Sequence, residues 1–152
     1  MEPLGDIDIN WDDFAAEKID YSTIDGEHYG VPVDNGTVVC AYRTDLLEQA
    51  GYTIDDLTGC TWDKFMEVGK AVKEKTGKAL LCMNSDGNDL PYIMLQAEGV
   101  SQFKDGKPYI TENETLVTSS RRLVEMAKEG ILLMPNSWSD YTDKAIQGDQ
   151  VA

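Results

Sequence analysis

The sequence predicts an α/β protein in which helices cover a sheet in layers. Two short apolar runs, 37–43 and 79–83, have the length and composition of buried strands. Stretches with apolar side chains every three or four residues, which is the helical period, alternate with these runs. Strand–helix alternation of this kind is typical of layered α/β domains. The 152 residues, of which 41% are hydrophobic, are enough to bury one core.

The first part of the chain predicts short local elements. Residues 11–19, WDDFAAEKI, fit a short helix in an acidic opening segment. The sequence YSTIDGEHYGVPV then predicts a β-hairpin, because Asp25-Gly26 can take the positive φ angles of a tight two-residue turn. Pro32 places the second strand near an edge or a bend. The run 37–43, TVVCAYR, predicts a strand that is buried on both faces.

Two helices and a second strand are expected next. Thr44 can cap a short helix, TDLLEQA, that stops at Gly51. A longer helix runs from about Thr61 to Thr76, and Gly77 ends it. The apolar face of this helix carries Trp62, Phe65, Met66, Gly69 and Val72. The following run, ALLCM, predicts the second buried strand.

Three further helices are expected in the rest of the chain. Asp89 is placed to cap the first, and KDGKPYI after it predicts a small turn or edge strand. Thr111 and Glu114 match the capping box at the start of a long helix. A last helix covers about 139–147, and a strand is expected to begin at 149–152.

Charge and length exclude several classes of protein. The 13 basic and 28 acidic residues give a net charge of −15. This balance argues against nucleic acid and anionic membrane surfaces as partners, because both need basic patches. No apolar run approaches the roughly 18 residues of a membrane span. The N-terminus lacks the basic and apolar regions of a secretory signal, so we expect either a cytosolic protein or a trimmed secreted one.

The cysteines are expected to be free thiols, buried in the apolar runs. Their odd number excludes a complete disulfide framework. They are Cys40, Cys60 and Cys82. A single histidine and the absence of a CxxC pair argue against a zinc site.

Signals for catalysis and for metal binding are weak. Nucleophile-elbow and phosphate-loop motifs are absent, and His28 is expected to be a solvated hairpin residue rather than a catalytic base. Carboxylates are abundant but scattered, so a hydrolase with a paired carboxylate site remains the alternative. Asn84, Asp86 and Asn88 alternate like calcium ligands, but the glycine and glutamate that such a loop requires are missing. We expect no catalytic residue, no metal and no cofactor.

Polar loops beside the expected strands are the candidate ligand sites. VDNG (33–36) precedes one strand and NSDGND (84–89) follows the other. In open α/β sheets ligands bind at loops beyond the strand ends, where such side chains can hydrogen-bond hydroxyl groups. The same residues also dominate ordinary turns. Trp138, in a polar loop, is either a stacking surface for a sugar or a partly buried anchor.

Three stretches of the sequence resemble the bacterial extracellular solute-binding proteins of family 1. YGVPVDNGTVVCAYRTDLLEQAGY is similar to the segment that crosses between lobes in that family, with Arg43 where asparagine is usual. TWDKFMEVGKAVKEKTGKALL resembles the helix and strand that follow. RRLVEMAKEGILLM and DKAIQGDQVA resemble a later region, whose usual Gly-x-Trp continuation is absent from this sequence.

The resemblance implies a domain organisation. Two α/β lobes of the layered α/β/α, periplasmic-binding-protein type II kind close on a ligand by a hinge in that family. We expect this chain to hold an incomplete set of those parts: a remnant of the N-terminal lobe with the hairpin (1–35), a lobe-crossing strand (36–43), the C-terminal lobe (44–148) and the start of a truncated return strand (149–152).

The resemblance also implies function. The parent would be a non-catalytic, extracellular lipoprotein or periplasmic protein that binds a mono- or oligosaccharide and delivers it to the permease of an ABC importer. By itself the chain is expected to bind sugar weakly or not at all, and to self-associate through apolar surface that a second lobe would cover. The expected ligand contacts are Asp34, Asn35, Thr37, Ser85, Asp86, Asn88 and Trp138.

Overall fold

The computed structural model describes residues 2–5, 7–84, 89–140, 143, 145 and 147–152. The chain divides into two units, Met1–Cys40 and Ala41–Ala152, and each unit is described by itself.

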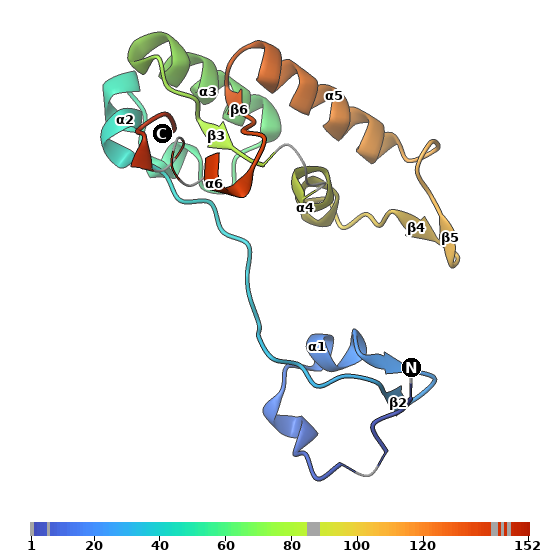
Figure 1. Cartoon of the computed structure of the whole chain (residues 1–152). Coiled ribbons are helices and arrows are strands. Elements are labelled where there is room, and N and C mark those ends of the chain that lie inside the picture. Colours follow the sequence, from blue (N-terminus) through green and yellow to red (C-terminus); the bar gives the residue numbers. More distant parts are fainter. Residues whose placement is uncertain (1, 6, 85–88, 141–142, 144, 146) are drawn as a thin grey trace. The chain divides into compact units, whose positions relative to one another are not determined.

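The first unit contains the predicted hairpin. Strands β1 and β2 pair antiparallel, with Thr23 opposite His28 (Figure 1). Asp25 (φ 52°) and Gly26 (φ 84°) both take the left-handed conformation that a tight turn of this kind requires, which confirms the predicted turn. The elements of this unit are η1 (Trp11–Asp13), α1 (Ala16–Asp20), β1 (Thr23–Ile24) and β2 (Glu27–His28).

An aromatic stack holds the hairpin against the opening segment. The rings of His28 and Trp11 lie 3.9 Å apart with an interplanar angle of 22°. The Thr23 hydroxyl donates its one proton to the Ile19 carbonyl (2.8 Å), so it accepts from His28 Nδ1 at 3.0 Å. The expectation that His28 is simply solvated is therefore wrong, because the ring is half-buried by this packing.

The apolar run 37–43 forms no strand, which corrects the prediction of a buried one. Val38 is 68% exposed and Val39 is 80% exposed. A buried strand needs backbone partners at its edges, and no described residue makes a backbone hydrogen bond to residues 37–41. Cys40 lies in this run and is exposed, whereas Cys60 and Cys82 are partly buried. All three cysteines are free thiols.

The second unit has mixed α/β architecture, as predicted. Strands β3 and β6 pair in parallel, with Leu81 opposite Leu132, and a parallel bridge joins Ala79 to Val151 on the other side of β3 (Figure 1). The expected strand at 149–152 is therefore present as a single bridge. The elements are α2 (Thr44–Ala50), η2 (Ile54–Asp56), α3 (Trp62–Thr76), β3 (Leu81–Cys82), α4 (Asp89–Ala97), β4 (Phe103–Lys104), β5 (Lys107–Pro108), α5 (Glu114–Lys128), β6 (Leu132–Leu133) and α6 (Trp138–Asp140).

Helix α3 forms as its sequence predicts. The Thr61 hydroxyl accepts a hydrogen bond from the Lys64 amide (3.2 Å), and Gly77 ends the helix in the left-handed conformation (φ 72°). Its apolar face is buried. Gly69 on this face permits close approach to the segment that enters β6, because a Cβ at that position would lie 2.5 Å from Ile131 Cγ2.

The caps of α2 and α5 differ from the predictions. Arg43, not Thr44, is the capping residue of α2, and its side chain makes no capping hydrogen bond. Asn113 rather than Thr111 caps α5: its Oδ1 accepts from the Leu116 amide (3.1 Å). Asn113 is only 1% exposed, and its Nδ2 also donates to the carbonyls of Ser101 and Tyr109, which frame the β4–β5 hairpin. An asparagine that can satisfy both the helix and the hairpin displaces the threonine.

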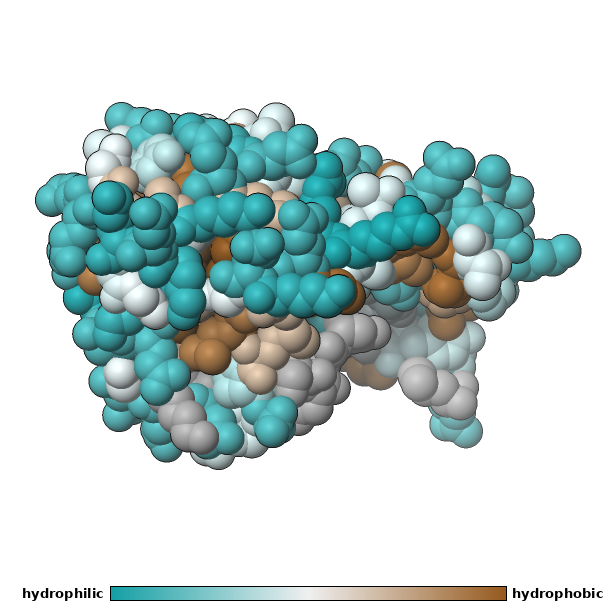
Figure 2. Space-filling view, turned by 90° about the horizontal axis from the view of Figure 1, so that it is seen from above, coloured by the Kyte–Doolittle hydropathy of each residue, from teal (hydrophilic) through white to brown (hydrophobic). Residues whose placement is uncertain are grey.

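One apolar core joins the helices of the second unit to its strands. It contains side chains from α2, α3, α4 and α5 together with Leu80, Ile131 and Leu132. Figure 1 shows α3 and α5 beside the β3–β6 pair. The face seen in Figure 2 is mainly hydrophilic, with apolar residues in small separate patches, as expected for a chain with net charge −15.

Candidate functional site

The carboxyl ends of β3 and β6 lie side by side. Because the two strands are parallel and in register, both chains leave the sheet at the same edge. The Met83 amide donates to the Leu133 carbonyl (3.1 Å), which keeps the chains together one residue beyond β3. We call Met83, Asn84 and residues 134–137 the carboxyl edge. The structure thus brings the beginnings of two predicted ligand loops, after β3 and after β6, to one place.

Asn84 is the most unusual residue at the carboxyl edge. Its side-chain Oδ1 is buried and accepts no hydrogen bond. Buried polar atoms are nearly always paired, because leaving one unpaired costs roughly 1–3 kcal/mol. This side chain was not among the predicted ligand contacts. Asn84 is the first residue of the predicted ligand loop NSDGND, although the predicted contacts in that loop were Ser85, Asp86 and Asn88.

The loop after β6 is organised by Ser137. Its Oγ accepts a hydrogen bond from the Asp140 amide (3.1 Å) and lies 3.1 Å from Ser139 Oγ. Trp138 is the first residue of α6, and the part assigned to its ring in ligand binding stays a prediction. Ser85, Asp86 and Asn88 lie outside the described residues, so their assignment also stays a prediction.

The remaining predicted contacts belong to the first unit. Asp34, Asn35 and Thr37 are all exposed and lie in the stretch between β2 and α2. Exposure leaves their polar groups accessible to a ligand, and the contact itself stays a prediction.

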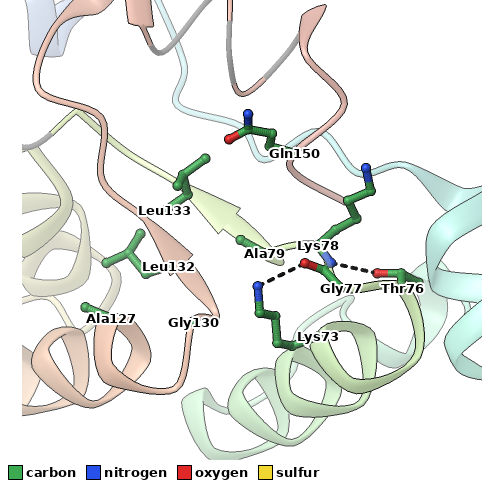
Figure 3. Close-up of a pocket in the computed structure, with 10 residues that line it drawn as sticks. All are labelled: Lys73, Thr76, Gly77, Lys78, Ala79, Ala127, Gly130, Leu132, Leu133 and Gln150. Carbon is green, nitrogen blue, oxygen red and sulfur yellow. Dashed lines mark hydrogen bonds between the residues drawn. The ribbon is translucent and has the colours of Figure 1, made fainter.

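A cavity of about 590 Å³ lies at the opposite, amino edge of the strands. Its walls come from the last turn of α3, the entry to β3, the end of α5, strand β6 and Gln150 (Figure 3). Lys73 Nζ donates to the Gly77 carbonyl (2.9 Å), and the Thr76 hydroxyl accepts from the Lys78 amide (3.1 Å). These polar groups complete the end of α3. Ligands of α/β sheets bind at carboxyl ends, so we assign the candidate site to the other edge.

A charged cluster fastens three distant segments at the amino edge. Arg43 Nη1 contacts Asp149 Oδ1 at 2.6 Å, and Lys78 Nζ contacts Asp149 Oδ2 at 3.2 Å. Arg43 also binds Asp45 (2.7 Å). Hydrogen bonds from Arg43 and then Lys78 lower the pKa of Asp149. These side chains are about half exposed, so the cluster is a weak structural tie rather than a ligand site.

The shifted carboxyl groups of the described residues all accept hydrogen bonds. A glycosidase needs a carboxylic acid whose pKa is raised, so that it can donate a proton. In the described part of the chain, every carboxyl group whose pKa is shifted has it lowered, chiefly by a hydrogen bond that the carboxylate accepts. These groups are Asp45, Asp56, Glu67, Glu112 and Asp149.

The described residues form neither a metal cluster nor a membrane-spanning helix. No group of three or more potential metal ligands occurs among them. None of their helices combines the length and apolar character that crossing a membrane requires. Burial raises the pKa of the Cys82 thiol to about 11, which keeps it protonated and a poor nucleophile.

Comparisons with known proteins agree on one family. The family model described as "Bacterial extracellular solute-binding protein" matches residues 1–152. A lactose-binding protein of Rhizobium radiobacter is 37% identical over 145 residues, covering 95% of this chain and 34% of that protein. An arabinooligosaccharide-binding protein of Halalkalibacterium halodurans is 30% identical over 115 residues, covering 76% of this chain and 24% of the relative.

A second arabinooligosaccharide-binding protein, from Bacillus subtilis, is 25% identical over 135 residues, covering 86% of this chain and 31% of the relative. The chain therefore spans about a third or less of the length of these relatives. No solved structure gives a significant match.

Proposed function

The chain belongs to the bacterial extracellular solute-binding proteins, and from this premise we propose that it forms part of the substrate-binding component of an ABC importer. The captured solute is a carbohydrate, either a mono- or an oligosaccharide. The observation that carries this class of ligand is that three relatives, one of them aligned over 95% of the chain, are all named as sugar-binding proteins.

The carboxyl edge is the part of the second unit that fits this task best. Sugars are bound by side chains that accept and donate hydrogen bonds to hydroxyl groups, and by aromatic rings that stack on the apolar faces of the pyranose. The loop after β3 contains asparagine, serine and aspartate, and the sequence after β6 contains asparagine, serine, tryptophan and aspartate. The parallel pairing of the two strands supports a single site formed by both loops.

We further propose that the two units belong to different lobes of the complete protein. Residues 1–35 would belong to the first lobe, 36–43 would cross between lobes, 44–148 would form the second lobe, and 149–152 would begin the return. The boundary between the units, after Cys40, falls inside the proposed crossing and supports this division. A ligand that contacts both lobes would then favour a closed state by hinge motion in the crossing segment.

This proposal assigns the protein to solute capture outside the cytoplasm, with a permease as its partner. The family's own description includes the word extracellular. A lipid anchor or a periplasmic location would each place the binding component beside the importer. The alternative of a small carbohydrate-active hydrolase is disfavoured by the names of the relatives, which are binding proteins.

Ligand-observed NMR tests the class of ligand even when binding is weak. Saturation transfer from the chain is measured to lactose, to an arabino-oligosaccharide and to a tripeptide of similar size. We expect transfer to at least one of the two sugars and none to the tripeptide. Transfer to the tripeptide and to neither sugar would show that the carbohydrate assignment is wrong.

A further inference from the structure

Two segments that are far apart in the sequence meet where the chain enters the second unit. Arg43 caps α2, and Asp149 lies 106 positions later in the chain. Arg43 Nη1 donates to Asp149 Oδ1 (2.6 Å), while Nε and Nη2 donate to the two carboxylate oxygens of Asp45 (2.8 and 2.7 Å). The guanidinium therefore binds two carboxylates at once, a task for which its rigid fork of donors is suited.

Asp149 is held by more hydrogen bonds than is usual for an exposed residue. Lys78 Nζ donates to its backbone carbonyl and to its Oδ2, so all three oxygens of the residue accept hydrogen bonds. Its backbone is left-handed (φ 54°), which is uncommon for a residue other than glycine. The chain then pairs with the entry to β3: the Ala79 amide donates to the Gln150 carbonyl (3.1 Å), and the Ala152 amide donates to the Ala79 carbonyl (2.8 Å).

These ion pairs have their larger effect on local opening. Between half-exposed side chains they add only a little to global stability. Short peripheral segments, by contrast, open at a small cost in free energy, so a weak tie is enough to change how often they open. The two segments tied here are 149–152 and the first turn of α2, where the amides of Leu46 and Leu47 donate to the Arg43 carbonyl (3.1 Å each).

We propose that Arg43 and Asp149 form a clasp, through which the first turn of α2 and the segment 149–152 open and close together. The meaning of the clasp rests on the proposed function. Under the proposed division into lobes, the chain enters the second lobe just before α2 and begins its return at Asp149. The clasp then fixes the second-lobe ends of both connections, so that hinge motion bends both as one. Arg43 and Asp149 are positioning residues, and neither is assigned a contact with the sugar.

Amide hydrogen exchange of the full chain, followed by NMR, tests the clasp from both sides. Arg43→Ala changes the segment before α2, yet it should speed exchange of the distant Ala152 amide about tenfold. Asp149→Asn removes the charge, keeps the shape and tolerates the left-handed backbone. It should likewise speed exchange of the Leu47 amide in α2. If each change sped exchange only in its own segment, the two segments would be uncoupled and the proposal would be overturned.

A double variant and a matched control sharpen the test. In a chain with both Arg43→Ala and Asp149→Asn, the Ala152 amide should exchange no faster than with Asp149→Asn alone, because Arg43 has already lost its partner. Asp45→Asn is the matched control, since Asp45 binds the same guanidinium and its side chain is 56% exposed, against 54% for Asp149. It should leave exchange of Ala152 unchanged. Additive effects in the double variant, or equal acceleration by Asp45→Asn, would contradict the clasp.

The outcomes separate this inference from the proposed function, because the exchange measurement needs no sugar. Coupled exchange of the two segments would support the clasp even where saturation transfer reached only the tripeptide and refuted the carbohydrate assignment. Saturation transfer to a sugar, together with uncoupled exchange, would refute the clasp and leave carbohydrate binding intact.

Discussion

Replacing Gly69 with alanine should destabilise the second unit, although alanine is the better helix former. Gly69 lies in the middle of α3, where the change to alanine by itself would favour the helix by about 1 kcal/mol. The new Cβ, however, would lie 2.5 Å from Ile131 Cγ2 and 3.3 Å from Ile131 Cγ1. Such an approach is far shorter than a normal carbon–carbon contact, so either α3 or Ile131 must move.

Ile131 has little freedom to move. It is fully buried, its amide donates to the Met126 carbonyl (2.9 Å), and its carbonyl accepts from the amides of Leu80 and Leu81 (3.0 Å each). Overpacking of a rigid core costs about 1–3 kcal/mol. After subtraction of the gain in helix propensity, we expect Gly69→Ala to lower the free energy of unfolding by up to about 2 kcal/mol.

Urea denaturation followed by far-ultraviolet circular dichroism measures this loss. With a slope of about 2 kcal/mol per molar urea, the midpoint should fall by up to roughly 1 M. The control is to make the same change in a chain that carries Ile131→Ala, which lacks the clashing side-chain atoms. Ile131→Ala by itself should lower the free energy of unfolding by about 2–5 kcal/mol. In that background Gly69→Ala should be neutral or stabilising. A raised midpoint for Gly69→Ala in the otherwise native chain would refute the described packing of α3 against Ile131.

Three further predictions concern charge, thiols and association. The pKa of Asp149 is lowered in the folded chain, so its contacts stabilise above the ordinary value of 3.8, and this stabilisation is lost as the pH falls below it. Urea midpoints of the wild type and Asp149→Asn should therefore differ at neutral pH and converge in acid; a difference that grows in acid would contradict the described contacts. Cys40 should react with a thiol reagent well before Cys82, because Cys40 is exposed and burial raises the pKa of Cys82 to about 11; mass spectrometry of the labelled peptides reads the order, and equal rates would count against it. We also propose that the exposed apolar run containing Val39 promotes self-association, so Val39→Lys should reduce the mass measured by light scattering; a monomeric mass for the unmodified chain would contradict this.

Local chemistry made several elements predictable from sequence. Asp25-Gly26 specifies the hairpin turn, and Thr61 with Gly77 bounds α3, because each depends on residues close in the chain. The strand expected at 37–43 does not form, because a strand depends on residues that are distant in the chain. Its composition favours a strand, but a strand also needs a backbone partner, and none of the described residues supplies one to residues 37–41.

The same distinction applies to the caps and to the site. Thr111 matched the local capping pattern, but Asn113 is the residue that caps α5. Asn113 also donates hydrogen bonds to the carbonyls of Ser101 and Tyr109, and these contacts exist only once the β4–β5 hairpin has folded back. The polar loops of the carboxyl edge could be located from sequence, since they follow strands. The unpaired oxygen of Asn84 could not, because burial and lack of a partner are properties of the folded chain.

The most direct test of the central claim is a map of amide chemical shifts during titration of the chain with lactose. We predict shifts that concentrate at Met83, Asn84 and residues 134–137, with little change at Ala79 and Gln150 beside the cavity. Shifts centred on Ala79 and Gln150 would contradict the assignment of carbohydrate binding to the carboxyl edge.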